Sequence, residues 1–306
     1  MLTAVSVVPP VGAFWPALTI PIQQHNPDGA FAEKVDGLEP VAAEISTNSY
    51  NQLDGDFYVG SRVPKRNIVL HLVMEPGGSN SVSDIRRNLY GYFMPKMNIT
   101  LQFDFSDRAS VLIDGYVESW DSDRWSSDPD AAISIVCPKP NFRATTATTV
   151  TGYSIYGDDP TVHDVLNPGD RMVGFEMGIS NPSSDTDFGG SIIIDRMIEG
   201  STPGEYFSVQ TLYLDNANGD IYLPQGIFNS VYVNTKQGEK TAEIRGPDSE
   251  GSPMLENLLG NMTDDSTWPI LWAAMHKVRV VTTDTTGWEG NALLWWLKFT
   301  PEWGAL

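Results

Sequence analysis

The chain has 306 residues, of which 41% are hydrophobic and 19% are charged, and it carries a formal net charge of −20 at pH 7. This apolar content excludes an intrinsically disordered chain. The acidity, spread over both halves without a basic run, argues against nucleic-acid binding by phosphate neutralisation. The single cysteine, Cys137, excludes an intramolecular disulfide, and no apolar run reaches the roughly 18 residues of a membrane span.

In chain order, the first strand signals come before residue 75. Residues 17–22 form a fair strand interrupted by Pro21, which indicates an edge or a bulge. Residues 56–64 and 66–74 predict two further strands around Pro64. In the second of these, apolar residues on both sides predict a strand covered, at least partly, on both faces.

One helix is predicted over residues 83–93. Ser81 or Ser83 can cap its first turn, apolar residues recur at helical spacing, and Pro95 ends it. Strict alternation then predicts a half-buried strand at 97–105, followed by a returning strand at 111–120. We expect Asp114-Gly115 to form a bulge or tight turn in that strand.

A change of composition follows residue 142. Residues 143–151 are small and polar, so they are interpreted as a linker, which predicts domains 1–143 and 144–306. The spacing of the later strands is that of an all-β sandwich. These strands are expected at 172–179, 191–197, 206–215, 221–223, 231–236, 241–245, 277–283 and 292–300. The fold class is therefore mainly β, with one helix in the first domain.

No catalytic, cofactor or metal motif is recognisable. Nucleophile-elbow, zinc-protease and P-loop patterns are absent, and the four histidines are scattered. The acidic run Asp121, Asp123, Asp128 and Asp130 lacks calcium-loop spacing and is interpreted as a solvated loop. The pair Asp158-Asp159 gives almost no support to a glycoside hydrolase. We therefore expect no enzyme and no cofactor.

Tryptophans crowd the last forty residues. Exposed aromatic side chains could form a sugar-binding platform, so a carbohydrate-binding module or adhesin remains an alternative function. The pattern over 293–298, including Trp295 and Trp296, instead predicts a strand covered on both faces. Core or interface packing is the preferred interpretation of these tryptophans.

Two parts of the chain resemble a known family. Arg66-Asn-Ile, the helix with Arg86-x-x-Leu89-Tyr90, Gly115-Tyr-Val-Glu and Cys137-Pro-Lys-Pro-Asn-Phe occur in the order of the ring-forming domain of distal tail proteins of long-tailed bacteriophages. Ser266-Thr-Trp-Pro-Ile-Leu and the terminal Pro301-Glu-Trp-Gly resemble that family's galectin-like domain. The galectin sugar-binding pattern is not evident, since Trp288 and Glu289 are adjacent.

The resemblance implies a structural protein at the distal end of a phage tail, assembled in the host cytoplasm. It implies a β-sandwich or barrel-like ring domain followed by a galectin-like β-sandwich. Six copies would form a ring between the tail tube protein and the tip hub protein, with the tape measure and receptor-binding proteins as further partners. DNA would pass through the lumen without specific binding, and no membrane is involved. The candidate interface residues are Arg86, Arg87, Tyr90, Asp107, Asp114 and Trp120.

Overall fold

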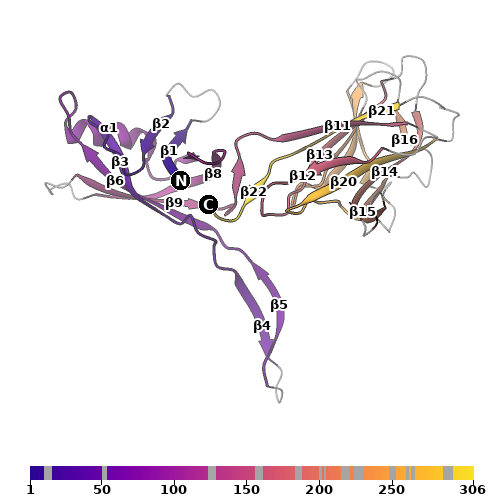
Figure 1. Ribbon diagram of the computed structural model, residues 1–306, viewed down its shortest axis with the longest axis horizontal. Helices are drawn as coiled ribbons and strands as arrows, with labels where there is room; N and C mark the ends of the chain where they lie inside the picture. Colours follow the sequence, from indigo (N-terminus) through magenta and orange to yellow (C-terminus); the bar gives the residue numbers. More distant parts are fainter. Residues whose placement is uncertain are drawn as a thin grey trace. The chain divides into compact units, whose positions relative to one another are not determined.

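Short strands dominate the computed structural model, which confirms the mainly β fold class (Figure 1). The described residues pack as two units, one comprising Met1–Thr145 with Trp303–Leu306 and the other Thr146–Glu302. The sequence-based division between residues 143 and 144 stays a prediction of domain limits. Among the described residues, no helix combines the length and apolar character that a membrane span requires. The structure describes residues 1–9, 16–49, 54–122, 129–155, 161–182, 188–199, 202, 205–214, 221–223, 230–247, 253–259, 262, 266–284 and 292–306.

The first unit is built on a nine-stranded sheet whose main path runs in the order β2, β1, β7, β8, β9, β6, β3. Neighbours along this path are antiparallel, and β10 pairs with both β8 and β22. No strand is predicted over residues 2–8, which form β1. The bounds are β1 Leu2–Val8, β2 Leu18–Pro21, β3 Gly29–Asp36, β6 Arg66–Glu75, β7 Asn98–Phe105, β8 Val111–Asp121, β9 Asp130–Cys137, β10 Phe142–Ala144 and β22 Glu302–Trp303.

Alternation along β6 places Ile68, Leu70 and Leu72 in the core. The residues between them are mostly half-buried, so the expected partial cover of both faces is confirmed. Cys137 is also buried, and burial raises the pKa of its thiol to about 12, which leaves it protonated and unreactive.

Helix α1 covers Val82–Tyr92, one residue earlier at each end than predicted. It begins at Ser81, whose hydroxyl accepts a hydrogen bond from the Asp84 amide while the Asp84 carboxylate accepts one from the Ser81 amide. Ile85 and Leu89 lie one turn apart and are both buried in the core of the first unit. The amphipathic pattern of the sequence therefore positions the helix against the sheet.

The prediction of a bulge or tight turn at Asp114-Gly115 is wrong. Strand β8 continues through this dipeptide, and its register shift lies between Val117 and Ser119. A Cβ atom at Gly115 would lie 2.7 Å from Cγ2 of Ile135 and 2.9 Å from Sγ of Cys137. Glycine is needed here because β9 packs closely against it, and not because the chain turns.

The segment interpreted as a linker forms strands instead. Residues 143–144 belong to β10, and the following threonine-rich run enters β11 (Thr148–Ile155). Strand β11 pairs along its whole length with β21 (Ala292–Phe299) at the edge of a sheet. Threonine and valine favour strands even in a polar run, and the free edge beside β21 supplies the pairing partner.

The second unit contains two sheets that enclose one core. The first has the order β11, β21, β13, β17, β18, β19, and the second has β12, β20, β14, β15, with β16 paired to β14. Buried apolar side chains from both sheets belong to a single cluster, as in a β-sandwich. The remaining bounds are β12 His163–Leu166, β13 Glu176–Ser180, β14 Phe188–Glu199, β15 Tyr206–Leu214, β16 Ile221–Leu223, β17 Ser230–Asn234, β18 Thr241–Pro247, β19 Pro253–Asn257 and β20 Met275–Asp284.

The expectation that β21 is covered on both faces is wrong for this chain by itself. Leu293, Trp295 and Leu297 are buried in the sandwich core. On the other face Leu294 is 45% exposed, and the neighbouring Trp296 is half-buried. Strand β21 is therefore a half-buried strand with an outward-facing tryptophan.

Arg66, at the start of β6, connects separate segments of the first unit. Only 2% of it is exposed, and its guanidinium carbon lies 4.5 Å from the centre of the Phe142 ring. Because Gly304 belongs to the end of the chain, this arginine helps to bind that end to the first unit. The guanidinium donates hydrogen bonds to the backbone carbonyls of Gly37, Glu39, Pro140 and Gly304.

Candidate functional site

Several exposed apolar side chains of the first unit lie together on a two-stranded hairpin, here called the arm. It consists of β4 (Glu44–Ser49) and β5 (Asp56–Arg62), which pair with each other and with no other described strand. Figure 1 shows these strands running away from the main sheet of their unit. Residues 56–62 lie within a predicted strand, whereas β4 is missing from the sequence-based prediction. The Asp54-Gly55 dipeptide, with Gly55 at a φ of 94°, is the signal that could have revealed the hairpin.

Large apolar side chains of the arm face solvent. Ile45 is 66% exposed, Tyr58 63% and Val59 55%. Polar contacts hold the hairpin together, including an Arg62–Glu44 ion pair with a 2.6 Å N–O distance. An isolated hairpin is marginally stable in water, and exposed apolar clusters mark contact surfaces. The arm therefore has the properties of a segment that is buried by a partner.

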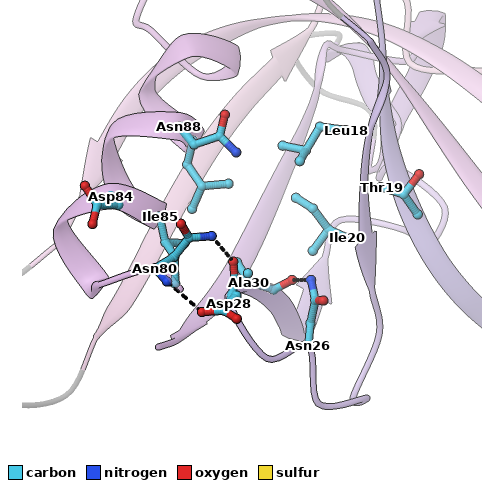
Figure 2. A pocket seen from close by; sticks show the side chains of 12 residues that line it. Leu18, Thr19, Ile20, Asn26, Asp28, Ala30, Asn80, Asp84, Ile85 and Asn88 are labelled. Atoms are coloured by element: carbon cyan, nitrogen blue, oxygen red, sulfur yellow. Dashed lines mark hydrogen bonds between the residues drawn. The ribbon is translucent and has the colours of Figure 1, made fainter. Parts of the chain in front are cut away.

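A cavity of about 210 Å³ lies between α1 and the strands β2 and β3 (Figure 2). Its apolar walls include Leu18, Ile20 and Ile85, and Figure 2 shows Asp28 and Asn80 beside each other at its edge. The Asp28 carboxylate accepts hydrogen bonds from the amides of Ser79 and Asn80, at 2.9 and 2.7 Å. These backbone donors hold the pKa of Asp28 below its usual value. The carboxylate thus fixes the turn before α1.

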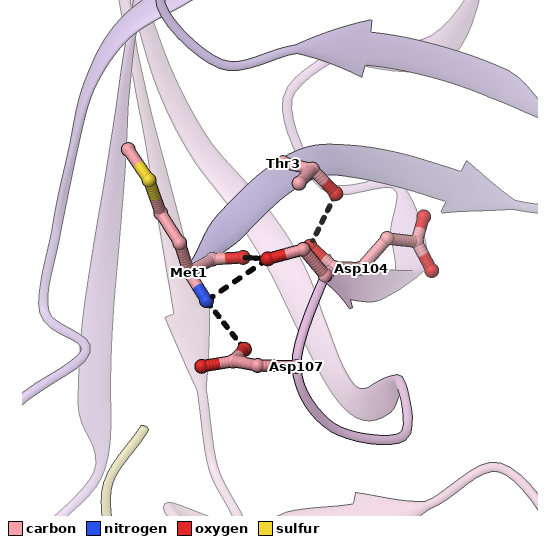
Figure 3. A network of polar contacts seen from close by, with 5 residues as sticks. Met1, Thr3, Asp104 and Asp107 are labelled. Atoms are coloured by element: carbon pink, nitrogen blue, oxygen red, sulfur yellow. Dashed lines mark hydrogen bonds and ion pairs between the residues drawn. The ribbon is translucent and has the colours of Figure 1, made fainter.

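A second polar network joins the start of β1 to the turn after β7 (Figure 3). The amino group of Met1 forms an ion pair with Asp107, and Thr3 Oγ1 donates to the Asp104 carbonyl at 2.9 Å. The hydrogen bond from the amino group lowers the pKa of Asp107. Asp107, one of the predicted interface residues, therefore already has a partner within the chain.

The structure brings two of the other candidates together. The rings of Tyr90 and Trp120 meet edge to face, with centroids 4.8 Å apart. Asp114 accepts two hydrogen bonds from Arg143, at 3.0 and 3.1 Å, and another from Thr100 at 2.7 Å. All of these contacts are made within the first unit.

The two helix arginines differ. Arg87 is exposed and has Nη1 3.9 Å from an Asp84 oxygen. Arg86 is half-buried, and its Nε has no hydrogen-bond partner among the described residues. That these six candidate residues contact another subunit stays a prediction.

In the described part of the chain, no group of three or more His, Cys, Asp or Glu side chains could hold a metal ion. Of the acidic run considered above, Asp123 and Asp128 lie outside the described residues, as do Asp158-Asp159 and Trp288-Glu289.

Several buried polar groups of the second unit contact one another. Arg196 Nε donates to Gln210 at 2.8 Å, and its Nη1 lies 3.4 Å from Nδ1 of His276. The other ring nitrogen of His276 lies 2.9 Å from the Trp272 carbonyl, which assigns the proton to Nε2. Burial and the nearby Arg196 cation lower the pKa of His276, so the ring is neutral. This arrangement positions side chains in the fold and presents no activated nucleophile.

No family model matches the sequence, and no curated protein matches it. The chain is similar in structure to the Dit protein of phage SPP1, described as a paradigm of hub adsorption apparatus in phages that infect Gram-positive bacteria. The TM-score is 0.57 at 15% identity, over 89% of this chain and 93% of that one. A chain of the activated phage P2 baseplate gives a TM-score of only 0.39 at 10% identity, over 98% of each chain. The chain thus shares the fold of the SPP1 Dit protein along nearly its whole length.

Proposed function

We propose that the chain is a non-enzymatic structural protein of a phage tail tip. The observation that carries this proposal is the shared fold with the SPP1 Dit protein over 89% of one chain and 93% of the other. A fold alone does not define a function. The arm adds independent support, because a hairpin with large exposed apolar side chains, paired with no other described strand, is suited to assembly.

In this proposal six copies close into a ring at the distal end of the tail. The arm of each first unit packs on a neighbouring copy, and rotation about one axis closes the set. One face of the ring meets the tail tube protein and the other meets the tip hub protein. The tape measure protein and receptor-binding proteins are further proposed partners in the virion, which is assembled in the host cytoplasm.

The acidity of the chain fits the passage of DNA through such a ring. We expect some of the carboxylates of Asp54, Asp56, Asp104, Asp107 and Asp114 to face the lumen. Negative groups repel the phosphate backbone, so the ring should not bind duplex DNA at moderate salt. Tight, salt-sensitive binding of a fluorescent duplex to the purified ring would contradict this part of the proposal.

The ring is tested by measuring mass in solution and imaging the purified full-length chain. We expect a mass about six times the 33.6 kDa of one chain and a ring in electron micrographs. The double variant Tyr58→Ser, Val59→Ser should reduce the mass to that of a monomer while its circular dichroism spectrum stays that of the folded chain, because within one chain both side chains are exposed. A matched control is Leu166→Ser, which alters a side chain 51% exposed in the second unit.

Two outcomes oppose the proposal. A wild-type chain that stays monomeric at all concentrations, and is not found in rings in virions, excludes the ring. A ring that persists in the arm variant excludes the arm as the contact that closes it.

A further inference from the structure

Two adjacent tryptophans of β21 lie over glycines on opposite faces of the same sheet. Trp295 is paired with Gly152 of β11, and Trp296 is paired with Gly178 of β13. A Cβ atom at Gly152 would lie 2.4 Å from Cζ2 of Trp295, and one at Gly178 would lie 2.4 Å from Nε1 of Trp296. Each indole therefore fills the space that a side chain on the neighbouring strand would take.

The two indoles have different surroundings. Trp295 is 2% exposed and meets the His163 ring edge to face at 4.7 Å, inside the sandwich core. Trp296 lies on the outer face, between the exposed side chains of Leu294 and Lys298. The same packing that fills the core on one face thus holds an indole along the surface on the other.

A second aromatic ring borders the same glycine. Tyr232 of β17 is paired with Gly178 on the side opposite Trp296, and the two aromatic ring centres are 6.2 Å apart. The Trp296 indole thus lies over Gly178, with the Tyr232 ring beside it on the next strand. We call Trp296, Gly178 and Tyr232 the platform.

Charged groups surround the platform in fixed positions. Glu176 pairs with Lys236, and Glu243 pairs with Arg245. The guanidinium carbon of Arg245 lies 3.6 Å from the centre of the Tyr232 ring. Burial and the nearby Glu176 carboxylate raise the pKa of Tyr232, so its hydroxyl stays protonated. The tyrosine and its neighbours are therefore held in place before any ligand arrives.

These features match the chemistry of a pyranose ring. A sugar presents C–H groups on its face, which pack on an indole, and hydroxyl groups at its edge. Carboxylates accept hydrogen bonds and guanidinium and ammonium groups donate them, so both kinds of partner for a hydroxyl are present. The charges around Tyr232 occur as two pairs of opposite sign, which favours a neutral ligand there over an ionic one. The centres of protein interfaces are, by contrast, depleted of charged residues.

We propose that the second unit binds a neutral pyranose unit of a glycan on the platform, with the sugar face against Trp296 and its hydroxyls toward the ion pairs around Tyr232. Because these groups are already paired, little side-chain freedom is lost on binding. The proposal concerns Thr146–Glu302 alone and does not depend on the formation of a ring.

The test measures binding of neutral oligosaccharides of glucose, galactose and N-acetylglucosamine to the full-length chain by saturation-transfer NMR and titration calorimetry. We expect at least one of these probes to bind, and Trp296→Ala to weaken its binding about 10-fold or more, as for a buried tryptophan contact at an interface. The matched control is Leu294→Ala, which removes an exposed apolar side chain of the same face and should leave affinity unchanged.

A second variant guards against misfolding. Gly178→Ala adds one methyl group where the Trp296 indole lies, so it should displace the indole and weaken sugar binding while keeping every functional group. Circular dichroism melts would show whether each variant is folded. Absence of binding to all the probes overturns the proposal, as does binding that Trp296→Ala and Gly178→Ala leave unchanged. A change of oligomeric state in these variants without loss of sugar binding would assign the face to contacts between copies and also overturn it.

Discussion

The first unit surrounds the cation of Arg66 with backbone carbonyls, whereas the second unit pairs its buried Asp195 directly with Arg279. The carbonyls around Arg66 come from segments far apart in the chain, and one belongs to the chain's end. Asp195 and Arg279 instead lie opposite each other on the paired strands β14 and β20. Arg66 therefore connects segments that are far apart in the chain, whereas the Asp195–Arg279 pair joins strands that are already hydrogen-bonded to each other.

Of the changes that compare the buried charges of the two units, we expect Arg66→Met to cause the largest loss of stability. Loss of the guanidinium leaves several backbone carbonyls without their donors, and each unsatisfied buried group costs about 1–3 kcal/mol. We expect a loss of about 4 kcal/mol or more in the free energy of unfolding, measured by urea denaturation of the first unit's transition. Arg62→Met, which breaks an exposed ion pair, is the control and should cost less than about 1 kcal/mol. Equal effects of the two variants would show that Arg66 does not hold these segments together.

The corresponding change in the second unit is Arg279→Met. Asp195, with 5% of its side chain exposed, then keeps a hydrogen bond from Thr211 at 2.7 Å but has no cation near it among the described residues. Arg279 is itself 29% exposed, so we expect a cost of about 2–3 kcal/mol, below the range for a fully buried pair. Combining it with Asp195→Asn should recover most of the loss, because no buried charge is then left unpaired. A double variant as unstable as the sum of the single ones would contradict this account.

A smaller effect is expected from the glycines under the two tryptophans. Gly152→Ala pushes Trp295 within a packed core, where overpacking costs about 1–3 kcal/mol. Gly178→Ala pushes Trp296, which can move outward into solvent, so its cost should stay below about 1 kcal/mol. Thermal melts of both variants measure the difference. A larger loss for Gly178→Ala would mean that the outer indole is as tightly packed as the inner one.

The smallest effect concerns pH. Burial lowers the pKa of both His163 and His276; Arg196 adds to the effect at His276, and Asp164 opposes it at His163. The unfolded chain therefore takes up protons first as the pH falls below 6.5, the ordinary value for histidine. Stability should be complete above that pH and decrease below it, until the folded-state pKa values are reached. The second unit should thus melt at a lower temperature at pH 5 than at pH 7. His163→Gln combined with His276→Gln should reduce this difference, whereas His25→Gln, in the first unit, should not.

The arm and α1 differ in how well local sequence pattern predicts them. The helix is predictable because capping residues, an apolar stripe and a terminating proline agree over residues 81–95, and its packing follows from the stripe. Strand β7 is predictable because its alternation identifies the face turned to the core, and β6 because its apolar run predicts a strand covered on both faces. Strand β4 is not, because its side chains are polar or exposed and no buried face creates a period.

Pairing across long distances explains what the sequence could not reveal. Residues 143–151 are polar by composition, and residues 148–151 become part of a strand by pairing with the edge beside β21. Trp295 and Trp296 are adjacent in sequence, so alternation alone predicts that they face opposite sides. Which of them lies in the core, and that each lies over a glycine, depends on the register with β11 and β13. Arg66 likewise reads as the first residue of a strand. Its burial follows from the return of the chain's end, because a strand's own pattern contains no information about which distant carbonyls will surround it.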